Sequence, residues 1–358
     1  IDGSFKFTKI SDDVNETDFG KTFDLSVGKQ SGKWRGEIGY NFEDKNYNPN
    51  DLGILFNNNE QGVYGFLGYR LLKPKGVFNN YGINLRYNVN FLHTPGTYTG
   101  TDISMSFWSN TKSRHSFGGN INYSSVGKNF NEPRQGTTSG IYFRNPMRLN
   151  VNHWGGTDRT RKLSVRYFMY YTYFKDNPKQ GYGFNVRPNY RFNNQFSMQY
   201  AFDLRRSNND QGYVNKVGND IIFGQRDRLS YENSISSKFN FSTMSTLTLA
   251  FRHNWTKVPY EDQFLKLNTS NGNLENSTYS DNHNVNFNSW NLDLNYIWQF
   301  APGSQLIAFY RHSIFSYNDQ AHLNFFDNLD KLFQEPNQHT FSLRVVYFID
   351  YNKLKNIF

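Results

Sequence analysis

Apolar and polar residues alternate along almost the whole chain, and this two-residue period constrains the fold more than any other feature. The segment YGINLRYNVNF (81–91) has apolar or aromatic residues at its odd positions and Gly, Asn or Arg at its even positions. The segment SWNLDLNYIWQFAPGS (289–304) has Trp, Leu, Leu, Tyr, Trp and Phe at the even positions from 290 to 300. Side chains of a strand point alternately to the two faces of a sheet. The sequence therefore predicts long strands with one apolar face and one polar face.

The same alternation recurs in about sixteen segments, with bounds that sequence fixes only to within a few residues. We expect strands at about 2–9, 21–28, 33–42, 60–71, 81–91, 101–110, 114–124, 146–155, 161–173, 181–192, 195–206, 219–241, 245–257, 284–300, 304–316 and 339–350. Most are close to the 9 to 11 residues that cross a bilayer at a tilt.

Short and long connections alternate between these segments. The short links are KQSG (29–32), TKSR (111–114), NN (193–194), STM (242–244) and APGS (301–304), and the long ones lie near 43–59, 125–145, 258–283 and 317–338. In an antiparallel meander this order puts short turns at one end and long loops at the other, as in outer-membrane barrels. A soluble sandwich or a β-helix is the rival fold, but a sandwich has no reason to sort its loops, and no fixed repeat is present.

Composition agrees with a barrel that has a polar interior. Hydrophobic residues make up 37% of the 358 residues, yet 34 Phe, 25 Tyr and 6 Trp argue against disorder. Even the apolar run LSVRYFMYYTYF (163–174) contains an arginine, so no helix is expected to span a membrane. The first residues, IDGSFKF, do not have the regions of a signal peptide, so we expect a mature or truncated chain. We predict an all-β fold: one transmembrane antiparallel up-and-down β-barrel over 1–358, in the bacterial outer membrane, with short periplasmic turns and long extracellular loops.

Parity also predicts which charged side chains face the lumen. The basic candidates are Arg35, Arg70, Arg86, Arg166, Arg187, Arg191, Arg205, Arg252 and Arg344, and the acidic ones are Glu37, Asp203, Glu232 and Asp293. The excess of arginine favours an electropositive lumen that selects anions. Alternatively, the arginines pair with acids, carbonyl groups and a plug segment that fills the barrel. Sequence leaves both interpretations open, although the inward aromatic residues Tyr64, Phe66, Phe168, Tyr170 and Phe348 favour a constricted lumen.

Aromatic residues near strand ends are candidates for the interfacial girdles of a barrel. We expect Trp255, Trp290, Trp298 and Phe300 to have this role. The expected partners are outer-membrane lipid and lipopolysaccharide, together with other outer-membrane or periplasmic proteins. The net charge of +9 permits an acidic partner without identifying it, and we expect no nucleic acid.

No catalytic site, metal site or cofactor is predicted. A barrel hydrolase needs a serine next to a histidine on one face, and the adjacent pairs His115/Ser116 and His312/Ser313 point to opposite faces. The oxygen-rich stretches SDDVNETD (11–18) and EDKNYNPND (43–51) could coordinate calcium, but neither has the spacing of an EF-hand loop. Cysteine is absent, so there is no thiolate site or disulfide.

Four segments carry a family resemblance. They are DGSFKF near the start, NYNPNDLGILFNNNEQGVYGFLGYR (46–70) with its NDLG at Asn50 to Gly53, DIIFGQRDRLSYE (220–232) and LRVVYFIDYNKL (343–354). They resemble a Bacteroidota outer-membrane barrel family of unestablished function, in which a sandwich similar to a type-nine carbohydrate-binding module precedes a C-terminal barrel. The resemblance implies that this sequence is the barrel part, that an N-terminal part is missing, and that the complete barrel has further strands.

Three classes of function follow from these expectations. The first is a pore or transport protein for polar or anionic solutes, which the resemblance implies are glycan-derived. The second is a non-conducting barrel that acts as an anchor or as a subunit of a larger outer-membrane complex, with docking through loops such as 258–283 and 317–338. The third is a barrel hydrolase.

Overall fold

A computed structural model describes residues 1–11, 17–48 and 58–349, and it contains sixteen long strands that correspond one to one with the predicted segments. Their bounds are β1 (Asp2–Ser11), β2 (Thr17–Lys29), β3 (Trp34–Glu43), β4 (Glu60–Leu71), β5 (Phe78–Leu92), β6 (Tyr98–Thr111), β7 (Ser116–Ser124), β10 (Arg148–Gly156), β11 (Leu163–Phe174), β12 (Gln180–Arg191), β13 (Phe196–Val217), β14 (Asp220–Ser242), β15 (Ser245–Val258), β18 (Val285–Ala301), β19 (Ser304–Asn318) and β20 (Asn337–Val346). These segments are rich in aromatic and β-branched residues, which favour strands.

Smaller elements lie in the long connections. The segment 125–147 contains β8 (Gly127–Asn129), a 3-10 turn (Thr137–Ser139) and β9 (Phe143–Asn145), and β8 pairs with β9. The segment 259–284 contains β16 (Leu265–Leu267) and β17 (Leu274–Asn276), and 319–336 contains α1 (Phe325–Gln334). No helix in the described residues is long and apolar enough to cross a membrane.

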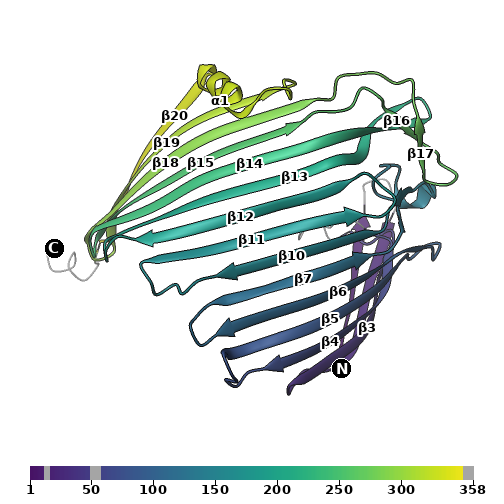
Figure 1. The fold of residues 1–358 in the computed structure, drawn as a ribbon, viewed down its shortest axis with the longest axis horizontal. Helices are drawn as coiled ribbons and strands as arrows, with labels where there is room; N and C mark the ends of the chain where they lie inside the picture. Colours follow the sequence, from purple (N-terminus) through teal and green to yellow (C-terminus); the bar gives the residue numbers. More distant parts are fainter. Residues whose placement is uncertain (12–16, 49–57, 350–358) are drawn as a thin grey trace.

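Each long strand pairs antiparallel with the next one along the chain, so the sheet is a meander. The small elements do not interrupt it, because β7 pairs directly with β10 and β15 pairs directly with β18. The predicted sorting of connections is present with one exception (Figure 1). Most tight turns gather at one end of the strands, and the segments with β8, β16 and β17 lie at the other, together with the two-residue turn between β13 and β14. We call these the short-turn end and the long-loop end.

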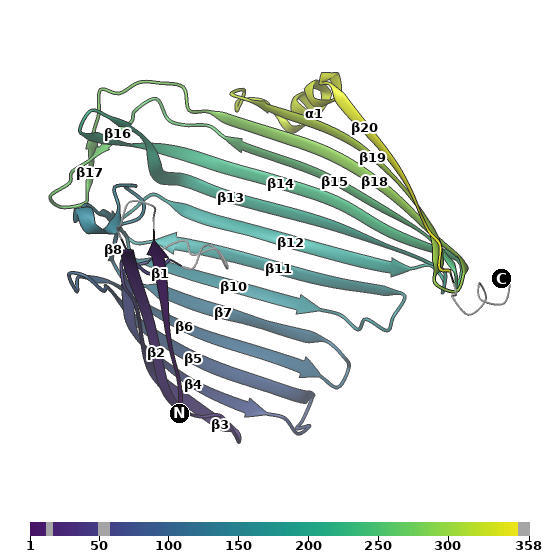
Figure 2. The same ribbon diagram turned by 180° about the vertical axis from the view of Figure 1, so that it is seen from behind.

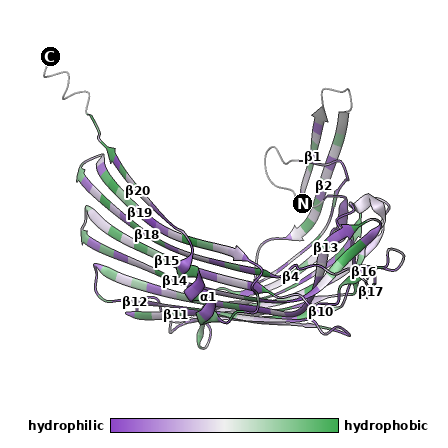
Figure 3. Cartoon of the chain, turned by 90° about the horizontal axis from the view of Figure 1, so that it is seen from above, coloured by the Kyte–Doolittle hydropathy of each residue, from purple (hydrophilic) through white to green (hydrophobic). Residues whose placement is uncertain are grey.

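The sheet is strongly curved, and its two outer strands lie apart (Figures 2 and 3). In the described residues, β1 pairs with β2, β20 pairs with β19, and no pairing joins β1 to β20. The all-β antiparallel prediction is confirmed, whereas the described chain forms an open sheet rather than a closed barrel. Closure requires a hydrogen-bonded partner for both outer edges, and the described strands do not supply it.

The hairpin β13–β14 extends beyond its neighbours at the long-loop end. β13 reaches Val217, eleven residues past the predicted end near 206, and register shifts lie at 207/210 and 213/215. β16 pairs with β14 beyond these shifts. A compact hydrophobic cluster forms there from Phe143, Ile221, Phe223 and Leu267. The long-loop end is therefore packed, although the sequence suggested open polar loops.

Two further expectations differ from the structure. The segment 317–338 was expected to be a loop, but it contains α1, whose first turn is capped by Asn324 Oδ1 accepting a hydrogen bond from the backbone N–H of Asp327. β20 begins at Asn337 and ends at Val346, so the expected strand to 350 is shorter at its end. The NDLG segment at Asn50 to Gly53 lies outside the described residues.

Candidate functional site

The register of the sheet separates two faces of opposite character. One row of directly opposed residues crosses five strands through Leu67, Leu85, Met105, Ile121 and Val151. These five side chains are 44–50% exposed. The adjacent row on the other face runs through Asn84, Ser106, Asn120 and Asn152. One face is thus apolar and exposed, and the other is polar.

The polar face lies on the concave side of the curve. Residues of β3, β4, β5, β6, β7, β10, β11 and β13 line one cavity of about 530 Å³, and the residues that β3 to β10 contribute from their polar positions include Asn41, Asn90, Asp102, Ser124 and Arg148. Neighbouring strands are about 4.8 Å apart, so the strands from β3 to β13 would span about 38 Å if the sheet were flat. The sheet is curved (Figure 3), and residues of all of these strands line the one cavity.

All predicted lumen residues lie on this concave face. The register places there Arg35, Arg70, Arg86, Arg166, Arg187, Arg191, Arg205, Arg252, Arg344, Asp203, Glu232 and Asp293. Trp290 and Trp298 lie on the opposite, convex face, and the ring of Phe300 contacts that of Trp298 at 5.7 Å. The register therefore divides these residues between two faces in the same way as residue parity.

Trp255 differs from its expected role. It lies on the convex face, but it is only 2% exposed, because Phe325 of α1 covers it and its indole N–H donates to Asn286. A side chain beneath a helix is not available to a lipid interface. The sequence did not indicate this, because the helix that covers Trp255 comes about seventy residues later.

Some concave arginines pair with acids on neighbouring strands or on their own strand. Arg205 contacts Asp203 at 2.8 Å, Arg252 contacts Glu232 at 3.6 Å, and Arg311 contacts Asp293 at 2.6 Å. The sequence analysis did not single out Arg311, because β19 is apolar at positions of both parities around it and gives no clear face. On β13 to β19, the concave arginines therefore pair with acids, as the second interpretation of the sequence predicts.

The remaining predicted arginines have no salt bridge to an acid among the described residues. Arg166 lies directly opposite Arg187, and its guanidinium donates to the amide oxygen of Gln199 at 3.2 Å. Arg86 lies over the ring of Phe66 at 5.4 Å. Directly opposed like charges destabilise a sheet. The concave face of β3 to β12 therefore carries arginines that form no salt bridge with the acids of the described residues.

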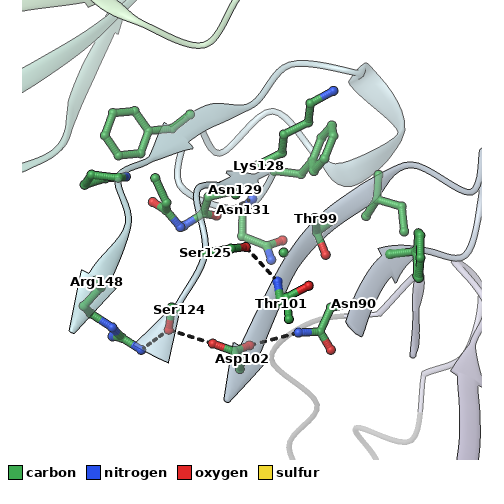
Figure 4. Close-up of a pocket in the computed structure, with 18 of the residues that line it drawn as sticks. Asn90, Thr99, Thr101, Asp102, Ser124, Ser125, Lys128, Asn129, Asn131 and Arg148 are labelled. Carbon is green, nitrogen blue, oxygen red and sulfur yellow. Dashed lines mark hydrogen bonds between the residues drawn. The ribbon is translucent and has the colours of Figure 1, made fainter. Parts of the chain in front are cut away.

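The cavity lies at the long-loop end beneath the segment 125–147 (Figure 4). Asp102 is its central charged group: the Asn90 amide donates to Asp102 Oδ2 at 3.0 Å, and the Ser124 hydroxyl donates to Oδ1 at 2.7 Å. The Arg148 guanidinium donates to Ser124 Oγ at 3.1 Å. The segment 125–147, which we call the roof, contributes Lys128, Asn129 and Asn131 to the lining of the cavity. The site is a polar cavity with fixed donors and acceptors, and both basic and acidic side chains line it.

Two carboxyl groups stand opposite each other near this cavity. Glu43 and Glu60 are directly paired across β3 and β4, and Glu60 lines the cavity. The long-loop rim of the concave face is therefore acidic at this place, unlike the arginine-rich surface below it.

An ion cluster ties the roof region to the strands. Asp210 is buried and contacts Lys179 Nζ at 2.5 Å and Arg226 Nε at 3.0 Å, and Arg226 also donates to the Tyr260 hydroxyl at 2.6 Å. The carboxylate of Glu132, in the roof, accepts a hydrogen bond from the backbone N–H of Tyr213. These contacts connect 125–147, β13, β14 and the segment after β15.

Among the described residues, one serine side chain forms a hydrogen bond with a histidine ring. Ser113 Oγ lies 3.1 Å from His115 Nδ1 in the turn between β6 and β7, in a Ser-x-His order that the sequence analysis did not consider. No hydrogen bond in the described part of the chain joins a carboxylate to this pair. The described residues contain no group of three potential metal ligands, and parts of both oxygen-rich stretches, 12–16 and 49–51, lie outside them.

A comparison with curated proteins gives no match. A protein family described as a domain of unknown function, DUF5916, matches residues 1–358. With its whole length covered by that match, the chain belongs to the DUF5916 family.

Proposed function

We propose that the chain forms most of the wall of a β-barrel in the bacterial outer membrane, and that its concave face lines a path for polar solutes with a preference for anions. The observation that carries this proposal is the separation of the faces: the convex side exposes rows of large apolar residues, and the concave side carries Asn, Ser and Arg. In water such an exposed apolar surface is unfavourable, whereas in a bilayer it is the solvated surface.

The height of the apolar surface supports this proposal. On β18 the convex positions change from Asn286 and Asn288 to an apolar series that runs from Trp290 to Trp298. Eight residues at about 3.3 Å each give about 26 Å along the strand, or about 20 Å after a tilt near 40°. Known outer-membrane barrels have an apolar band about 25 Å tall.

A complete barrel also requires partners for β1 and β20. In a meander of sixteen strands the first and last run antiparallel, so direct pairing or an even number of additional strands closes the sheet with antiparallel ladders throughout. Lipid does not hydrate exposed backbone groups, so an open edge is not tolerated within the bilayer. We therefore include closure by the same polypeptide in the proposal.

The anion preference rests on the opposed pair Arg166 and Arg187. Neither has a salt bridge in the described residues, so an incoming anion relieves their mutual repulsion. Paired arginines such as Arg205 do not have this property, because Asp203 already neutralises the charge.

Single-channel recording of the full-length protein in planar bilayers tests the proposal. We expect discrete conductance with anions permeating more than cations, and we expect the double variant R166S/R187S to lose a large part of that selectivity. The matched control is R205S/D203S, which removes a neutralised pair from the same face and is expected to change the selectivity much less. A folded protein in the bilayer without conductance would contradict the pore.

A second function is favoured by one observation. The roof 125–147 and the packed cluster around Phe143 and Phe223 give the long-loop end a fixed shape over the concave side. A long-loop end of fixed shape favours a non-conducting barrel that binds another outer-membrane protein. Absence of conductance together with co-purification of a stoichiometric partner in mild detergent would favour this function over the pore.

A further inference from the structure

Helix α1 lies across the strands on the convex face. A single row of directly opposed residues crosses four strands through Tyr231, Trp255, Asn288 and Ser316. The ring of Phe325, at the start of α1, contacts Tyr231 and Trp255, and Asn328 contacts Asn288. Glu335, just after the helix, accepts a hydrogen bond from Ser316 at 3.0 Å. The helix therefore follows this row, at a large angle to the strands.

Buried polar contacts hold the helix in this place. Asn286 Nδ2 donates to Asn328 Oδ1 at 2.8 Å, and Asn288 Nδ2 donates to the carbonyl of Asn328 at 3.3 Å. Lys257 Nζ donates to the carbonyl of Leu323, just before the helix, at 3.0 Å. Asn286, Asn288 and Asn328 are all buried. The orientation of α1 about its own axis is thus fixed.

The sheet covers only part of the apolar side of α1. Successive residues of a helix turn by about 100°. Leu332 and Phe325 share the side that faces the sheet with Asn328, and Leu332 is buried. Phe326 and Phe333, seven positions apart, share the adjacent side and are 78% and 53% exposed.

This uncovered side points toward the apolar band. The ring of Phe333 contacts that of Trp290 at 6.1 Å, and Trp290 lies two residues closer to the short-turn end than Asn288. Phe326 lies on the same side of the helix as Phe333. The charged residues Asp327, Asp330 and Lys331 lie on the other exposed side. Phe326 and Phe333 therefore extend the apolar surface of the sheet at its boundary nearest the long-loop end.

We infer that α1 rests on the outer surface of the bilayer and places Phe326 and Phe333 at the boundary between headgroups and acyl chains. The inference rests on the proposed function, because it requires the convex face to contact lipid. An amphipathic helix parallel to the surface, with aromatic residues toward the chains and charged residues toward water, is the arrangement that binds a membrane interface. Two acids and one base on the polar side provide little attraction to charged lipid, so apolar burial holds the helix and salt has little effect.

These 358 residues contain no cysteine, so single labels can be placed once any cysteine elsewhere in the full-length protein is replaced by serine. Four single-cysteine variants of the full-length protein, F326C, F333C, D327C and M105C, are labelled with an environment-sensitive fluorophore and reconstituted in phosphatidylcholine vesicles. Each vesicle preparation contains lipids spin-labelled either near the headgroup or deep in the acyl chain. Met105 is an exposed convex residue in the middle of β6 and reports whether the sheet enters the bilayer. Asp327 is the matched control beside Phe326 on the water-facing side of α1.

We expect shallow spin labels to quench the probes at 326 and 333 at least threefold more strongly than the probe at 327, and deep labels to quench the probe at 105 most. Added salt is expected to leave the quenching at 326 and 333 unchanged. Gel mobility before and after heating selects folded samples, so a variant that misfolds is excluded before measurement.

Each alternative result has a distinct meaning. Strong quenching at 105 with equal, weak quenching at 326, 333 and 327 overturns the role of α1 and leaves the proposed barrel intact. Weak quenching at all four positions overturns both. Cross-linking of the cysteine at 326 to a second copy or to a partner protein in the vesicles also overturns the inference, because the occupant of this surface is then a protein.

Discussion

At the residue scale, the buried carboxylate Asp210 forms two short ion pairs at the long-loop end, with Lys179 and Arg226. Burial alone would raise the pKa of Asp210, but attraction and hydrogen bonds from Lys179 and Arg226 outweigh burial and hold this pKa below its usual value. Removal of one partner from a buried ion pair costs about 3 kcal/mol or more, because the other charges lose their compensation. Arg206 and Asp227 form a longer ion pair at 3.9 Å, and both side chains are about half exposed. Removal of one partner from such an exposed pair costs less free energy.

We expect Asp210→Asn to lower the free energy of local unfolding at the long-loop end by about 3 kcal/mol. Limited proteolysis of the segments 125–147 and 259–284 measures this change, since cleavage reports the population of the opened state. Asp227→Asn is the control, and we expect it to change the free energy of local unfolding by less than about 1 kcal/mol. Equal cleavage of the two variants would mean that Asp210 does not organise the roof.

The same cluster predicts a pH dependence. A carboxyl group with a lowered pKa in the folded protein contributes stability that is complete above its unfolded pKa, near 4, and is lost as the pH falls through the folded pKa. Resistance of the roof to an acid-active protease is therefore expected to decline below about pH 4 in the natural protein. In the Asp210→Asn variant this part of the decline is expected to be missing, and an unchanged profile would contradict the assignment.

At the element scale, the alternation of residues was enough to identify every long strand and to place the arginines and acids on the correct face. It did not identify the end of β13, because SNNDQGYVNKV (207–217) is polar and contains two register shifts. It did not identify α1 either, although Asn324 followed by Asp327 is a local capping signal. The cavity was not predictable, because its roof depends on contacts such as Glu132 with Tyr213, which are distant in the sequence.

The buried hydrogen bond between Asn286 and Asn328 is expected to hold α1 on the sheet. Asn328→Ala removes the side-chain oxygen that accepts a hydrogen bond from Asn286 Nδ2, and an unpaired buried group costs about 1–3 kcal/mol. The hydrogen bond from Asn288 to the backbone carbonyl of residue 328 is retained. We expect amide hydrogen exchange in 325–334 to become at least tenfold faster, while exchange in β5 stays unchanged. Gln334→Ala removes only an exposed hydrogen bond to Asp330 and is the control. Unchanged exchange in the Asn328 variant would show that the hydrogen bond between Asn286 and Asn328 does not hold the helix.

At the scale of the whole molecule, the two outer strands decide between an open sheet and a barrel. β1 and β20 have ten residues each, and about half of the residues of an antiparallel edge strand direct their backbone groups outward. Each such group without a partner costs several kcal/mol in lipid, so an open edge costs tens of kcal/mol. In a bilayer both edges are therefore expected to be paired.

Hydrogen exchange of the full-length protein in vesicles tests this expectation. If the edges are paired, amides of 2–11 and 337–346 are as protected as those of the central strand β5, because lipid and a neighbouring strand exclude exchange on both sides. The hairpin of β16 and β17, outside the apolar band, is the internal reference for faster exchange. Rapid exchange in both outer strands, with β5 fully protected, would mean that the sheet stays open and that the barrel proposal is wrong.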